Sequence, residues 1–163
     1  MKQFRIRFIV LGLSCIVGIL LFASCSKNKD VTYYNYTFRD ENDVWEAELK
    51  IEGSTTFYTN DNGALDVDNR FNSALIVVYK GELLELQGIR NLKISYEGAV
   101  LGGSQEVEYG EGEHINSKVF KLTGGGNGAT PPEDDVIMVT IQIDDRETQN
   151  LELTTAKHKF ETY

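Results

Sequence analysis

The side chains best suited to bind a metal ion lie in one short segment. Asp61, Asn62, Asp66 and Asp68 flank Gly63 in the run DNGALDVDN. Calcium takes about six to eight oxygen ligands, so these four residues are a candidate calcium site. Asp and Asn also favour turns, because their side chains bond to nearby backbone groups. The segment is therefore either a calcium site or a solvated hairpin turn, and we predict no other cofactor.

A second candidate site consists of aromatic side chains. Tyr34, Tyr36 and Phe38 share one face of a predicted strand, and Trp45 follows shortly after. An exposed aromatic row could stack on sugar rings or on a peptide. Packing in the core or across strands would explain the same row, because half-buried strands favour aromatic residues. Exposure of the four side chains discriminates between a ligand surface and a core.

Catalytic signatures are missing from the chain. It contains neither a G-x-S-x-G elbow nor an H-E-x-x-H zinc pair, and its glycine-rich segment lacks the G-K-[ST] ending of a phosphate-binding loop. We therefore predict no catalytic residue and no enzyme. The alternative is a small carbohydrate-active hydrolase that uses two Asp or Glu carboxylates about 5 to 9.5 Å apart.

The N-terminal segment has the pattern of an export signal. Three cations precede an apolar run from Phe8 to Phe22, which is shorter than the roughly 20 residues of a membrane-spanning helix. Small residues then precede Cys25, and this pattern resembles a bacterial lipobox. The cations are Lys2, Arg5 and Arg7.

The lipobox predicts that residues 1–24 are a signal peptide and that Cys25 carries a lipid, palmitate included. Residues 25–30 would be a short tether to a single β domain over 31–163. The protein would then lie on the extracytoplasmic face of the cell membrane, anchored by more than one acyl chain. Ordinary signal cleavage beside a coincidental cysteine and an uncleaved membrane helix are the alternatives.

The net charge of the chain limits the classes of partner that it can bind. The whole chain has 16 Lys and Arg against 25 Asp and Glu, and removal of the three N-terminal cations leaves 13 − 25 = −12. Such a chain has no basic stripe for phosphates, so we predict no nucleic-acid partner. A cationic peptide or protein is the favoured class of charged partner. The sequence does not indicate an oligomeric state.

Alternation of apolar and polar residues predicts strands. It is clearest over Val44–Glu52 and Val136–Asp144, and Ala74–Lys80 is a nearly continuous apolar run suited to a central strand. We expect an antiparallel β-sandwich of about eight or nine short strands, with a small β-barrel as the alternative. Asp144-Asp145 would be a hairpin turn that could pair Ile141 and Ile143 with Leu151 and Leu153 on one face. Gly124–Pro132 would be a loop, because glycine and proline weaken strands.

Several of these segments resemble short, uncharacterised lipoproteins of Gram-positive bacilli. The resemblance lies in ENDVWEAE at 41–48, LKISYE at 92–97 and DDVIMVTI at 134–141. It implies export, lipidation and one β domain, and it brings no activity and no functional residues.

Together these features predict a membrane-anchored extracytoplasmic lipoprotein that binds a peptide, protein or cell-envelope ligand without catalysis. The exposed edge of a sheet could accept an added strand, a mode of binding that needs no motif. The hydrolase and a calcium-stabilised structural module are the two alternatives.

Overall fold

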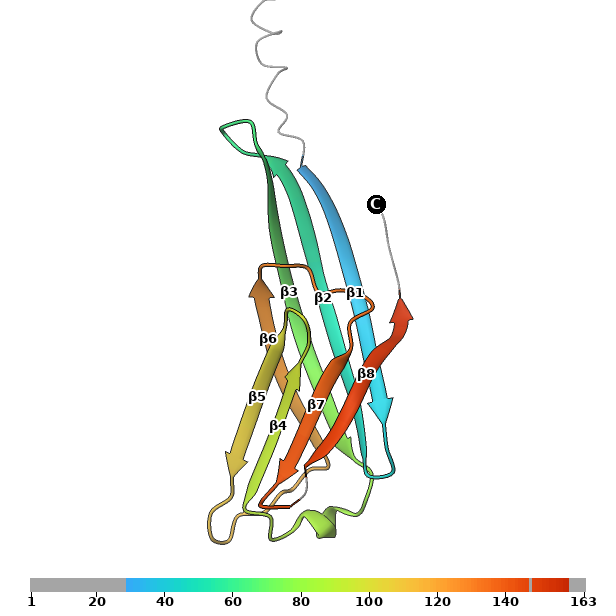
Figure 1. The fold of residues 1–163 in the computed structure, drawn as a ribbon. Helices are drawn as coiled ribbons and strands as arrows, with labels where there is room; N and C mark the ends of the chain where they lie inside the picture. The colour runs from blue at the N-terminus through green and yellow to red at the C-terminus, as the bar shows by residue number, and fades with distance from the viewer. Residues whose placement is uncertain (1–28, 147, 159–163) are drawn as a thin grey trace, which may run out of the picture. The chain divides into compact units, whose positions relative to one another are not determined.

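The computed structural model describes residues 29–146 and 148–158, the last two by backbone alone. It is an all-β structure, as predicted, with one short helix (Figure 1). No helix in this part of the chain has the length and hydropathy to cross a membrane. The elements are β1 (Lys29–Glu41), β2 (Trp45–Thr59), β3 (Leu65–Tyr79), η1 (Leu83–Leu86), β4 (Asn91–Glu97), β5 (Gly102–Glu108), β6 (Val119–Asn127), β7 (Ile137–Ile143) and β8 (Gln149–His158).

The chain forms two units, which are described separately. The described part of the larger comprises residues 31–57, 67–146 and 148–158, and that of the smaller comprises residues 29–30 and 58–66. The smaller unit contains the turn between β2 and β3, where the side chain of Asn60 accepts hydrogen bonds from the N–H groups of Asn62 and Ala64, each 3.0 Å long. Gly63 has a φ of 78°, which glycine adopts without steric cost. All further statements concern the larger unit unless the smaller is named.

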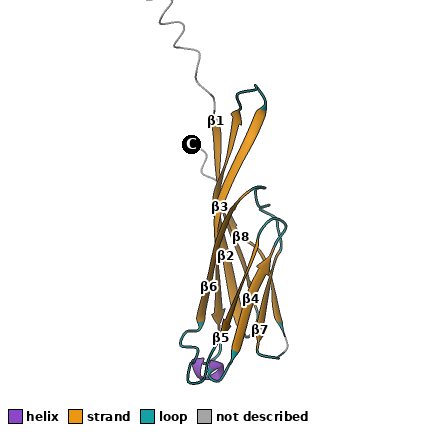
Figure 2. Cartoon of the chain, turned by 90° about the vertical axis from the view of Figure 1, so that its left-hand side faces the viewer, coloured by secondary structure: helices purple, strands orange, loops and turns teal. Residues whose placement is uncertain are grey.

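One eight-stranded sheet has the order β5-β4-β7-β8-β1-β2-β3-β6. Short hairpins join β1 to β2, β4 to β5 and β7 to β8, so these strands are neighbours in both sequence and space. The two end strands, β5 and β6, contact each other without forming a ladder. The sheet is therefore nearly closed and barrel-like, which corresponds to the alternative that we predicted from the sequence (Figure 2).

The pairing of β1 with β8 joins the two four-stranded halves of the sheet. Phe38 lies opposite Thr155 and Arg39 opposite Thr154, and an irregularity between Thr37 and Phe38 shifts the register. A bulge of this kind bends a strand and increases its twist. The bend lets one continuous sheet fold back on itself.

The interior follows from the alternation that we predicted. Side chains of Trp45, Leu49 and Ile51 on β2 are buried, and the intervening Glu46 and Lys50 are exposed. Other strands show the same period of two, and their inward side chains form one core. The largest fully buried members are Trp45, Phe38, Leu49, Ile51, Leu75, Ile89, Ile137, Ile141 and Leu153.

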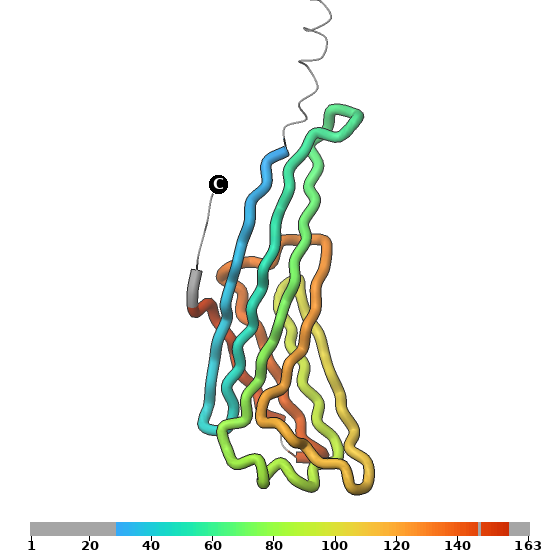
Figure 3. Tube along the Cα trace, turned by 180° about the vertical axis from the view of Figure 1, so that it is seen from behind, coloured from blue at the N-terminus to red at the C-terminus, as the bar shows by residue number. Residues whose placement is uncertain are grey.

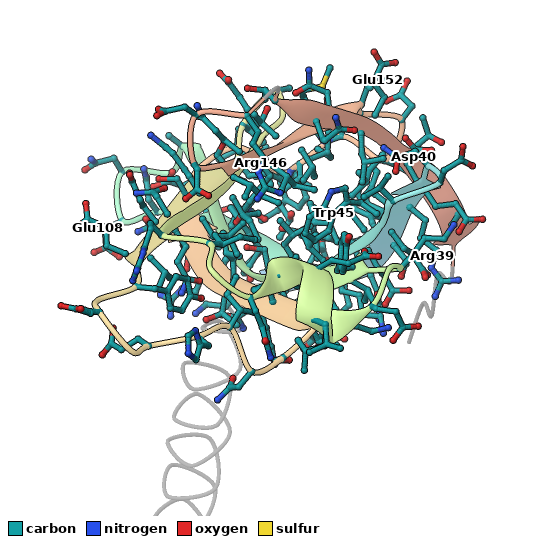
Figure 4. All side chains as sticks on the ribbon, turned by 90° about the horizontal axis from the view of Figure 1, so that it is seen from below. Arg39, Asp40, Trp45, Glu108, Arg146 and Glu152 are labelled. Carbon is teal, nitrogen blue, oxygen red and sulfur yellow. The ribbon has the colours of Figure 1, made fainter. Side chains whose placement is uncertain are left out.

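The helix η1 covers one end of this core. Figure 4 shows η1 in front of Trp45 when the structure is viewed from below. The Trp45 ring packs against Tyr79, with centroids 4.9 Å apart, and against Phe120 at 6.2 Å. Leu86 of η1 is buried with them.

The prediction that Gly124–Pro132 is a loop is wrong for its first four residues. Gly124 to Asn127 belong to β6 and pair with β3, so that Gly126 lies opposite Phe71. A Cβ on Gly126 would lie 3.0 Å from the Phe71 ring, so the bare glycine leaves room for that ring. Because β6 is an end strand, it loses little by lacking side chains on this stretch.

Candidate functional site

The predicted aromatic ligand surface is not exposed. Tyr34, Tyr36, Phe38 and Trp45 have exposed fractions between 0 and 7%, so these side chains belong to the core. Tyr34 stacks on Tyr36, and Tyr36 packs edge-on against Phe38. The four side chains therefore belong to the core, and this corrects the ligand-surface interpretation in favour of core packing. Tyr33, on the opposite face of β1, is 60% exposed.

The predicted calcium ligands do not gather into a cluster. Asp61, Asn62 and Asp66 belong to the smaller unit, and Asp68 belongs to the larger one. In the smaller unit the Tyr58 hydroxyl donates a hydrogen bond to Asp66. In the larger unit Asp68 forms an ion pair with Arg70 at 3.2 Å. Within residues 29–146 and 148–158, no three His, Cys, Asp or Glu side chains are grouped so as to hold a metal ion.

Cys25 and the whole predicted signal peptide lie outside the described residues. Lipidation therefore remains a prediction from the sequence.

A pocket of about 240 Å³ lies at the seam between the end strands β5 and β6. We define the seam as the gap between these two strands, which are yellow and orange when viewed from behind in Figure 3. The buried side chains of Leu92 and Ile94 line the pocket, and Ile115 enters from the loop between β5 and β6. Further lining comes from Gln105, Val107, Tyr109, Asn116, Ser117, Val119, Phe120 and Lys121.

The pocket is mostly apolar, with polar groups at its rim. Val107, Tyr109 and Phe120 are half-buried, and Val119 is 52% exposed. Burial raises the pKa of Tyr109 above its ordinary value. An apolar cavity with few polar groups is the usual form of a small binding site.

Backbone hydrogen bonds hold the lower end of β5 in place. The N–H of Tyr109 donates to the carbonyl of Arg90, and the Arg90 guanidinium donates to the carbonyl of Gly110, each at 2.8 Å. Asp144, at the turn after β7, accepts hydrogen bonds from the N–H groups of Arg90 and Asn91. The hydrogen bond from Asn91 is the largest cause of the lowered pKa of Asp144. The turn after β7 therefore positions the strand pair that forms one wall of the pocket.

Exposed carboxylates are frequent on β5 and in the loop that follows it, but none of them lines the pocket, whose charged lining residue is Lys121. Glu106 and Glu108 on β5 are exposed, as are Glu111 and Glu113 in the following loop. Glu108 lies at the periphery of the barrel in Figure 4. Residues 102–121 contain these four glutamates and two lysines, so the net charge of the segment is 2 − 4 = −2. The seam thus combines a largely apolar pocket with a neighbouring strand and loop that carry exposed glutamates.

Among the described residues, two carboxylates have pKa values that depart clearly from the ordinary range, and both values are lowered. Burial of Glu48 would raise its pKa, but hydrogen bonds and charges from Lys50 and Arg39 outweigh that effect. Asp144 is the other. A general acid of a glycoside hydrolase needs a raised pKa, which neither residue has.

Sequence reasoning missed the seam residues. The only available signal was the strand pattern of Gln105–Tyr109 beside an acidic, glycine-rich stretch. Nothing local indicates that β5 and β6 are the two ends of the sheet, because this depends on pairing between distant segments.

No family model, curated protein or solved structure matches the chain. The resemblance to lipoproteins of Gram-positive bacilli therefore stays a prediction from the sequence segments alone.

Proposed function

We propose that the chain is a lipid-anchored extracytoplasmic protein that binds a cationic peptide or protein segment without catalysis, at the seam between β5 and β6. The observation that carries the proposal is the apolar pocket of about 240 Å³ beside β5, a strand whose Glu106 and Glu108 are exposed. A cavity of about 150 Å³ in another protein holds a benzene molecule. The seam pocket can therefore accept an aliphatic side chain of a ligand.

Electrostatics favours a cationic ligand. The field of a chain with a charge of −12 would attract cations over distances up to the Debye length, about 8 Å at physiological salt. The exposed Glu108 and the two exposed glutamates of the following loop add to this field near β5, whereas Lys121 in the pocket lining opposes it. Glu106 is partly neutralised by Lys93 at 3.7 Å, and a ligand cation would compete with that lysine.

Lipid anchoring is the second part of the proposal. Replacement of Cys25 by Ser should abolish incorporation of labelled palmitate and shift the protein from the membrane fraction to a soluble fraction. The unaltered protein should remain in the membrane fraction after a salt wash, because acyl chains hold it there. A full-length protein that retains residues 1–24 and takes up no label would contradict this part.

Binding can be measured with a defined peptide. We choose acetyl-Lys-Val-Lys-Val-Lys-Val-Lys-amide, with the corresponding glutamate-valine peptide as its opposite in charge. The lysine peptide should bind the domain, and its affinity should fall as salt rises, because screening weakens attraction between exposed charges. The glutamate peptide should show no measurable binding by calorimetry.

A matched pair of variants locates the site. Val119→Asp places a carboxylate at the rim of the pocket, where it should interfere with burial of an apolar side chain. Val136→Asp is the control, because Val119 and Val136 are 52% and 51% exposed and Val136 does not line the pocket. Only Val119→Asp should weaken binding of the lysine peptide. Equal weakening by both variants would contradict the location, and no binding by the unaltered domain would contradict the function.

A further inference from the structure

We infer that the ligand binds as an added antiparallel strand on the free edge of β5. This inference rests on the proposed function and adds the mode of binding and the alternation of side chains that the ligand must have. It follows from the register of β5, the faces of its side chains and the occupation of the opposite edge.

The register shows which backbone groups of β5 are available. The N–H of Tyr109 bonds to Arg90, and the N–H of Gly98 bonds to Leu101, so odd-numbered residues of β5 form the hydrogen-bonded pairs with β4. The N–H and C=O groups of the even-numbered residues then point away from β4. These residues are Gly102, Ser104, Glu106 and Glu108, and β5 has no second neighbour in the strand order of the described sheet.

Side-chain direction fixes the pattern of the ligand. Side chains of Glu106 and Glu108 point to the outer face, and those of Gln105 and Val107 line the pocket. In an antiparallel pair, residues directly opposite each other share a face. Ligand residues opposite Glu106 and Glu108 should therefore be cationic, and those opposite Gln105 and Val107 should be apolar. The matching ligand is a segment of alternating cationic and aliphatic residues.

The edge of β6 is less available than that of β5. The N–H of Tyr79 bonds to Lys118, so the odd-numbered residues of β6 point their backbone groups away from β3. The N–H and C=O groups of Val119 are already bonded. The Ser117 hydroxyl accepts a hydrogen bond from the Val119 N–H and donates one to the Val119 C=O, each at 3.0 Å. Lys121 lies on this edge as well, and an edge lysine discourages strand pairing.

A second copy of the chain fits the edge of β5 poorly. Antiparallel pairing of two β5 strands would bring the glutamates of one copy, Glu106 and Glu108, close to those of the other. Like charges on neighbouring strands destabilise pairing. A cationic segment from a different protein meets no such repulsion.

Backbone methylation tests the mode of binding separately from binding itself. In the antiparallel arrangement the lysines of the Lys-Val peptide lie opposite the even-numbered residues of β5, so lysine N–H groups form the new hydrogen bonds. One peptide carries N-methyl groups on its two central lysines and the other on two valines, with composition and charge identical. Methylation of the lysines should weaken binding about tenfold or more, because each lost hydrogen bond lowers affinity roughly 2- to 12-fold. Methylation of the valines should change it less than about threefold.

A change in the protein provides the complementary test. Ser104→Pro removes an N–H that points away from β4, and proline is tolerated at such an edge position. It should weaken binding of the unmodified peptide at least about fivefold, and Ser104→Ala should leave binding unchanged. Circular dichroism should show both variants folded.

The outcomes separate the two proposals. If none of the lysine peptides binds, the proposed function fails. If all three bind equally, the function stands and strand addition is overturned. If methylation of the valines is the damaging change, the antiparallel register is wrong. If sedimentation shows a dimer that Ser104→Pro dissociates, a second copy occupies the edge and the inference is overturned.

Discussion

Replacement of Asn69 by Ala should destabilise the domain in a way that the hydrogen-bond geometry specifies. Asn69 is 3% exposed, and its Oδ1 accepts hydrogen bonds from the Tyr34 hydroxyl at 2.9 Å and from Thr55 at 3.1 Å. Its Nδ2 donates to the carbonyl of Ala129 at 3.2 Å. The cluster thereby attaches the segment between β6 and β7 to the core.

Removal of the Asn69 amide affects its hydrogen-bond partners to different degrees. Thr55 keeps its hydrogen bond to Thr130 at 3.0 Å, and Ala129 is exposed, so water can replace the lost donor. The Tyr34 hydroxyl is buried and loses the partner that the structure gives it. A buried group left without a partner costs about 1 to 3 kcal/mol, and loss of the side-chain packing adds roughly 1 kcal/mol. Asn69→Ala should therefore cost about 2 to 4 kcal/mol in the free energy of unfolding.

A double-mutant cycle measured by urea unfolding tests this reasoning. Tyr34→Phe alone should cost about 1 kcal/mol, because it removes one hydrogen bond and leaves Asn69 bonded to Thr55. In the double variant no hydroxyl is left without a partner, so the combined cost should be smaller than the sum of the single costs by about 1 kcal/mol or more. Costs that add within about 0.3 kcal/mol would refute the argument that Tyr34 is left unpaired.

Three further changes have defined outcomes. Asp144→Ala should cost about 1 to 3 kcal/mol by thermal unfolding, and Asp144→Asn less, because Asn keeps an acceptor and tolerates the φ of 47°. Because the pKa of Asp144 is lowered in the folded state, its contribution to the free energy of unfolding is present above the unfolded pKa of about 3.9 and is lost as pH falls through the folded pKa. Asp144→Asn should therefore reduce the loss of stability in acid. An acid unfolding profile that Asp144→Asn leaves unchanged would contradict this. Gly53→Ala should lower the urea midpoint strongly, because its Cβ would lie 2.5 Å from the Tyr34 ring and 2.6 Å from a backbone carbonyl. At Gly88 an added Cβ meets no atom within 4 Å, so Gly88→Ala carries only the strain of a φ of 83° and should lower the midpoint less. EDTA should leave the melting temperature unchanged; a decrease that disappears in Asp61→Asn would restore the calcium alternative.

The sequence predicts the strands well where one face is buried. Alternation identifies β2 and β7, because a single sheet covers their inner face and water covers the other. Alternation does not predict which residues lie opposite each other on neighbouring strands. In the hairpin after Asp144, Leu151 lies opposite Val139 and Leu153 opposite Ile137, whereas the sequence suggested Ile141 and Ile143 as their partners. The loop is longer than a two-residue turn, and the inner face stays the same although the pairs shift.

The candidate site was harder to predict for two physical reasons. Exposed and buried aromatic rows show the same period of two, so alternation alone could not show that Tyr34 and Tyr36 are buried. The glycines of β6 favour a loop locally, but pairing with β3 outweighs this preference. The free edge of β5 results from the order of all eight strands, which depends on contacts between distant segments.

Amide hydrogen exchange in the presence of the Lys-Val peptide tests the central claim most directly. If the peptide adds a strand to β5, exchange at Ser104, Glu106 and Glu108 should slow by about tenfold or more, and exchange at the already bonded amide of Val119 should not change. Binding of the peptide with unchanged exchange at these three β5 amides would contradict the account.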